Sequence, residues 1–132
     1  ATLPGTSTTF QDDPGSGIHE WAVIAVLQSV SSSSVLCSQT IAPQAPGALS
    51  CSVSGGTVVL NWTNNEVYDS VIVSRDGVNL ATLVGSTTNY SDTVEPGVYS
   101  YSVRGSTSGV SSLGVDCQIT RNPLSVADLD CL

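Results

Sequence analysis

The chain of 132 residues contains an internal repeat with a period of 80 residues. When the sequence is shifted by 80 positions and laid over itself without a gap, residues 1–52 match residues 81–132 at 17 positions. The aligned pairs include Phe10 with Tyr90, Asp12 with Asp92, Gly17 with Gly97, Trp21 with Tyr101, Val23 with Val103, Cys37 with Cys117 and Cys51 with Cys131. A period of this length marks a structural unit that recurs along the chain.

The repeat predicts four segments. Residues 1–40 are the last strands of an incomplete repeat, residues 41–47 are a linker, residues 48–118 are a complete repeat, and residues 119–132 are a second linker with the first strand of another repeat. Pro43 and Pro46 fit the first linker, since proline interrupts a strand ladder. A unit of this size buries a modest core and needs added support, for which cysteines are candidates.

Composition excludes several classes of function. Eleven acidic residues stand against three arginines and no lysine, so the net charge is -8, which argues against nucleic acid as a partner. No run of 18 apolar residues is present, so we expect no membrane insertion. Cysteines at fixed places in the repeat predict disulfides, an oxidising compartment and a secreted or cell-surface protein.

The complete repeat has the pattern of an all-β protein. Val58, Leu60 and Trp62 share one face of a strand, and Tyr99, Tyr101 and Val103 alternate with polar residues. Asp76-Gly77 is a strong signal for a tight hairpin. About seven short strands with turns every eight to twelve residues predict an immunoglobulin-like antiparallel β-sandwich, repeated in tandem.

Four motifs in this order resemble those of a fibronectin type III domain: Leu60-Asn61-Trp62, Arg75-Asp76-Gly77, Tyr90-Ser91-Asp92 and the run from Pro96 to Arg104. The resemblance covers about residues 44–118 and, through the repeat, the two flanking segments. It implies a core that contains Trp62, with Tyr99 in the place of the family's corner tyrosine. The core we expect is Leu60, Trp62, Tyr99, Tyr101 and Val103; a bacterial immunoglobulin-like repeat is the alternative.

The strand order of such a sandwich predicts how the four cysteines pair. Cys51 is late in the first strand and Cys117 is late in the last, and these strands lie at the edges of opposite sheets. A Cys51–Cys117 disulfide would therefore join the two sheets. Cys37 would lie about a strand length from Cys51, too far for the under 7 Å between Cα atoms that a disulfide allows. Cys37 and Cys131 are left to pair with other repeats, to remain free, or to join each other between chains.

No catalytic or cofactor site can be assembled from the sequence. The single histidine, His19, lies in the incomplete repeat and the aspartates are scattered over turns, so we expect no enzyme, no metal and no cofactor. Calcium near a repeat junction is the alternative, with oxygen ligands from Asp12-Asp13 and Asp128-Asp130, but no full ligand spacing is present. Asn61 and Asn89 begin acceptor sequons for N-glycosylation. Tyr68 is the aromatic residue that we expect to be exposed.

Two functions fit these observations. The first is a structural repeat of an extracellular fibre, filament or adhesin stalk, assembled head-to-tail by strand complementation between neighbouring repeats or copies of the chain. The second is a polysaccharide-binding or spacer module attached to a secreted enzyme. Exposed coplanar aromatic residues on one sheet face would favour the second function.

Overall fold

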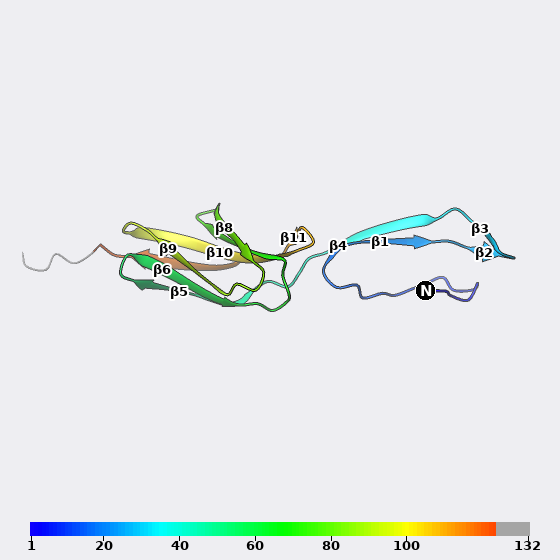
Figure 1. Ribbon diagram of the computed structural model, residues 1–132, viewed down its shortest axis with the longest axis horizontal. Helices are drawn as coiled ribbons and strands as arrows, with labels where there is room; N and C mark the ends of the chain where they lie inside the picture. Colours follow the sequence, from blue (N-terminus) through cyan, green and yellow to red (C-terminus); the bar gives the residue numbers. More distant parts are fainter. Residues whose placement is uncertain (124–132) are drawn as a thin grey trace, which may run out of the picture.

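A computed structural model describes residues 1–123, in which all regular secondary structure is β-strand. A complete sandwich and a smaller hairpin unit lie end to end along the long axis of the molecule (Figure 1). Pro123 is the last residue described, so Cys131 and the strand expected from residues 124–132 lie outside the described part.

The complete sandwich contains two antiparallel sheets. One sheet has the order β5-β6-β9, and in the other β8, β7 and β10 follow one another, with β11 and β12 both paired to β10. The strands are β5 (Gly47–Ser54), β6 (Thr57–Thr63), β7 (Ser70–Arg75), β8 (Val78–Val84), β9 (Asn89–Thr93), β10 (Gly97–Thr107), β11 (Val110–Ser111) and β12 (Val115–Arg121). The predicted all-β, immunoglobulin-like sandwich is confirmed.

The Asp-Gly hairpin lies where the sequence places it, between β7 and β8. Asp76 and Gly77 have φ angles of 50° and 81°, the left-handed conformation that a tight hairpin turn requires at both central positions. This turn sets β7 beside β8, and β7 in turn pairs with β10 in the middle of the larger sheet.

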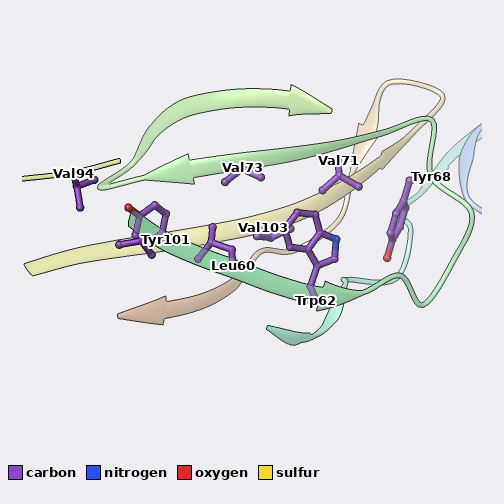
Figure 2. Close-up of a cluster of buried hydrophobic side chains, with 9 residues drawn as sticks. Leu60, Trp62, Tyr68, Val71, Val73, Val94, Tyr101 and Val103 are labelled. Atoms are coloured by element: carbon purple, nitrogen blue, oxygen red, sulfur yellow. The ribbon is translucent and has the colours of Figure 1, made fainter. Parts of the chain in front are cut away.

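The core lies between the two sheets (Figure 2). Leu60 and Val103 are 0% exposed, Tyr101 is 1% exposed and Trp62 is 4% exposed. Tyr99 is only half-buried and packs against the edge of this cluster. The other buried apolar residues are Val58, Tyr68, Val71, Val73 and Val94. Alternation along β6, β7 and β10 explains all of these residues except Tyr68 and Val94, which lie in loops, since every second side chain of a strand faces the same side.

The hairpin unit contains β1 (Gly17–Val23), β2 (Val26–Leu27), β3 (Val30–Ser31) and β4 (Val35–Ile41). The register of β1 on β4 equals that of β10 on β12 at an offset of 80 residues: Trp21 lies opposite Cys37 as Tyr101 lies opposite Cys117. The residues before β1 run alongside this hairpin without forming a regular strand (Figure 1). The two segments that match in sequence thus also match in strand pairing.

A side-chain hydrogen bond recurs with the same geometry in both units. Ser32 Oγ accepts a hydrogen bond from Ala25 N at 3.0 Å, and Ser112 Oγ accepts one from Gly105 N at 3.0 Å. Both hydroxyls also donate to the carbonyl oxygen of the next residue. The serine retained by the repeat therefore makes the same two hydrogen bonds in both units.

Candidate interaction surface

The disulfide joins an edge strand of one sheet to an edge strand of the other. Cys51 of β5 is bonded to Cys117 of β12, with 6.3 Å between their Cα atoms. These strands belong to different sheets, so the bond joins the two layers. Cys37 is a free, exposed cysteine on β4. Cys131, the remaining cysteine, lies beyond the described residues.

One face of the hairpin unit leaves apolar side chains more exposed than their equivalents in the sandwich. We call this the open face and define it by Trp21, Val23, Val35 and Cys37, which alternate along β1 and β4 and lie opposite one another in two pairs. Trp21 is half-buried and the other three side chains are exposed. Val23 is 69% exposed and Val35 is 73% exposed, whereas Val103, the equivalent of Val23, is 0% exposed. The described hairpin unit has no counterpart of β7, which pairs with β10 beside Val103, or of β6, whose side chains face Val103 from the other sheet (Figure 2).

A carboxylate at the edge of the open face is already held in place. Trp21 Nε1 donates a hydrogen bond to Asp12 Oδ2 at 3.0 Å, as the Tyr101 hydroxyl donates to Asp92 Oδ2 at 2.9 Å. In the sandwich, Asp92 also accepts from Arg75 Nη1 at 2.5 Å. Asp12 accepts a hydrogen bond from Trp21, but within residues 1–123 it accepts none from an arginine.

Glu66 accepts hydrogen bonds from both the hairpin unit and the linker. Oε1 of Glu66 accepts a hydrogen bond from the Ser16 hydroxyl of the hairpin unit, and Oε2 accepts one from the backbone N–H of Gln44 at 2.8 Å. These two bonds, that from Ser16 above all, hold the pKa of Glu66 below its ordinary value. No local sequence pattern marks Glu66, because its partners lie far away in the sequence.

Tyr68 is buried, so its predicted exposure is wrong. Its side chain is only 5% exposed, and its hydroxyl donates a hydrogen bond to the carbonyl oxygen of Gln44 at 2.7 Å. The ring lies against Gly105, where an added Cβ would come within 2.3 Å of it, so glycine is required there. The linker residues Pro43 and Pro46 are buried as well. Tyr68 therefore fixes the linker instead of offering a surface for sugar stacking.

The two glycosylation sequons lie on neighbouring strands. Asn61 of β6 and Asn89 of β9 are both exposed and are paired directly opposite each other. Directly opposed residues have Cβ atoms about 4.5–5.5 Å apart. The sequence could not show this proximity, because it depends on the register of two strands that are not consecutive.

The described residues offer neither a metal site nor a spanning helix. Within residues 1–123, no three His, Cys, Asp or Glu side chains lie close enough together to hold a metal ion. No helix long and apolar enough to cross a membrane occurs in that same part of the chain.

An antiparallel sandwich with the strand orders β5-β6-β9 and β8-β7-β10-β12, cored by Trp62 and Tyr101, defines a fibronectin type III-like domain. An Fn3-like protein from Clostridium thermocellum is 32% identical to the chain, with a TM-score of 0.53; the match covers 64% of this chain and 98% of that one. The chain belongs to the fibronectin type III family.

Two further solved structures share the fold. A segment of two fibronectin type III domains from chicken tenascin has a TM-score of 0.64 at 17% identity, and the match covers 79% of this chain and 65% of that segment. The spore cortex lytic enzyme SleM of Clostridium perfringens has a TM-score of 0.58 at 17% identity, with 77% of this chain and 38% of that enzyme covered. The chain thus spans less than two thirds of either protein. No protein-family model and no curated protein matches it by sequence.

Proposed function

We propose that the chain is a non-enzymatic structural spacer of an extracellular fibre or stalk, in which fibronectin type III repeats follow one another in fixed orientation. The observation that carries this proposal is the bound linker. Glu66 contacts both the hairpin unit and the linker, and Tyr68 and Asn65 hold the carbonyl oxygens of Gln44 and Ala45 at 2.7 and 3.0 Å. A spacer that sets a distance needs such a stiff joint between its units.

Two features support the extracellular location: the disulfide and the negative net charge of the chain. Disulfides form and persist outside the cytosol, and Cys51–Cys117 joins the two sheets of a small sandwich. The net charge of -8 keeps neighbouring molecules soluble through mutual repulsion. Neighbouring repeats are the partners that this role requires.

The alternative is a carbohydrate-binding or spacer module attached to a secreted enzyme. The likeness to part of a spore cortex lytic enzyme favours it. Stacking on a sugar needs exposed aromatic rings, however, and Trp62, Tyr68 and Tyr101 are buried. Phe10 is 55% exposed but lies before β1 rather than on a sheet face.

Residual dipolar couplings test the stiffness of the joint. We expect amide couplings from β1–β4 and from β5–β12 to fit one alignment tensor, because the linker holds both units. Glu66→Ala should split the fit into two tensors of different magnitude. Glu95→Ala is the matched control, since this exposed glutamate lies outside the junction. Two tensors in the unaltered chain would rule out a stiff spacer.

Sedimentation with insoluble polysaccharide separates the two functions. We expect the chain to stay in the supernatant with cellulose and with peptidoglycan. Saturable binding to either one that Phe10→Ala abolishes would favour the module attached to an enzyme.

A further inference from the structure

The open face is the uncovered half of a sandwich whose covered form is present in the same chain. Trp21, Val23, Val35 and Cys37 take the places of Tyr101, Val103, Val115 and Cys117, in the same strand register. In the complete sandwich, Leu60 and Trp62 of β6 lie over Tyr101 and Val103 (Figure 2). Exposed apolar side chains that are adjacent on one sheet mark a surface that binds another element.

Three features of the open face specify the chemistry of its occupant. The apolar quartet requires a facing strand with large apolar side chains, as β6 provides in the sandwich. Asp12, held by Trp21, lacks the arginine that Asp92 receives from β7. Cys37 is free where Cys117 is bonded to a cysteine of β5. In the complete sandwich, residues 47–80 supply all three of these: an apolar strand, an arginine and a thiol.

We propose that the open face docks the first strands of another repeat of this sequence type, and that Cys37 forms a disulfide with the cysteine of that repeat that corresponds to Cys51. A second copy of this chain fits less well, because its own strands from β5 to β8 are already packed in a sandwich and held by the Cys51–Cys117 bond.

The bond forms by oxidation of two thiols: each sulfur loses a proton and one electron, and an oxidised thiol–disulfide partner of the secretory compartment accepts the two electrons. The inference goes beyond the spacer role, because the open face can be completed whether or not the joint between the units is stiff.

A chain extended by its own repeat tests the proposal. Residues 44–80 are added ahead of Ala1, so that Leu80 joins Ala1 as it joins Ala81 in the sequence. Peptide mapping without reduction should then show Cys37 linked to the added copy of Cys51, with Cys51–Cys117 retained. Alkylation of Cys37 should change from complete in the original chain to absent in the extended one.

Two variants of the extended chain separate docking from adventitious oxidation. With Cys37→Ser, we expect nuclear Overhauser contacts between the Val23 methyl groups and the added copy of Leu60 to persist, because packing does not depend on the bond. With the added copies of Leu60 and Trp62 replaced by aspartate, we expect Cys37 to react with the alkylating agent again.

Three results would overturn the proposal. The first is a Cys37 that stays reactive in the extended chain. The second is a Cys37–Cys37 link between molecules, which would assign the face to a second copy. The third is a disulfide between the added cysteine and Cys117.

Discussion

The hydroxyl of Tyr101 donates a hydrogen bond to Oδ2 of Asp92 at 2.9 Å inside the complete sandwich. Arg75 donates to the same oxygen from the side of β7. Burial of Tyr101, together with the neighbouring carboxylate, raises the pKa of its phenol to about 12. One aspartate thus joins β7, β9 and β10 across the two sheets.

Removing this hydroxyl should destabilise the sandwich. Tyr101→Phe keeps the ring and deletes the donor to a charged acceptor, so we expect the free energy of unfolding to fall by about 1.5–3 kcal/mol. Urea titration measures the change. Tyr90→Phe is the matched control, because the hydroxyl of this half-buried residue has no hydrogen-bond partner within residues 1–123, and it should change stability little. Equal losses in the two variants would contradict the assigned role of Asp92.

Alkaline pH should weaken the sandwich through the same residue. The pKa of Tyr101 is about 12 in the folded protein and about 10 in an unfolded chain. The stabilisation that the neutral phenol provides is complete below the unfolded value and is lost as pH rises from there through the folded value. Urea midpoints measured across this window should therefore fall, and fall less in Tyr101→Phe. A midpoint that is independent of pH would be inconsistent with the raised pKa.

Trp62 should be the most costly single truncation in the core. It is 4% exposed, and its Nε1 donates a hydrogen bond to Asn64 Oδ1 at 3.1 Å. Replacement of a buried tryptophan by alanine removes packing and leaves a cavity, so Trp62→Ala should cost about 3–5 kcal/mol. Denaturant titration checks the value, with Trp62→Phe as a milder control. A cost under about 1 kcal/mol would mean that Trp62 is not part of the core.

Local alternation was sufficient to predict much of the sandwich. Leu60, Trp62, Tyr101 and Val103 lie on the inner face because strand period alone decides which side they occupy. Tyr99 shares their phase, yet it is half-buried, because it lies near the start of β10 at the edge of the cluster. The alternation of a strand decides which face of the sheet a side chain lies on, and its position along the strand decides how deeply it is buried.

The junction could not be predicted, since it depends on contacts between distant segments. Ser16 and Glu66 are 50 residues apart, and each is an ordinary polar loop residue in the sequence. The sequence predicts an exposed Tyr68, because this residue lies in a polar loop outside the alternation of the strands. Its burial arises from Gln44 and Gly105, which only the folded chain brings together.

The Cys51–Cys117 bond should contribute strongly to stability. It closes a separation of 66 residues, for which the chain-entropy model gives about 4 kcal/mol. We expect the double variant Cys51→Ser, Cys117→Ser to lose about that much in urea titration. Cys37→Ser is the control and should leave stability unchanged, because this thiol is exposed and free. A double variant as stable as the parent would mean that the sheets are held by packing alone.

Acid should loosen the joint between the units before it unfolds the sandwich. Hydrogen bonds from Ser16 and Gln44 lower the pKa of Glu66 while the joint is formed. The stabilisation they bring is therefore complete above the ordinary glutamate pKa and is lost as pH falls through the lowered value. We expect dipolar couplings of the hairpin unit to diverge from those of the sandwich in that window.

The matched variant Glu66→Gln keeps the size of the side chain and removes its charge. It should give diverging couplings already at neutral pH and no further change on acidification, because no carboxylate remains to be protonated. Ser16→Ala should also loosen the joint, because it removes the hydrogen bond that Glu66 accepts from the hairpin unit, although the bond from Gln44 N is retained. If the parent chain and Glu66→Gln respond identically to acid, the joint is held by Tyr68 and the buried prolines instead of by this carboxylate.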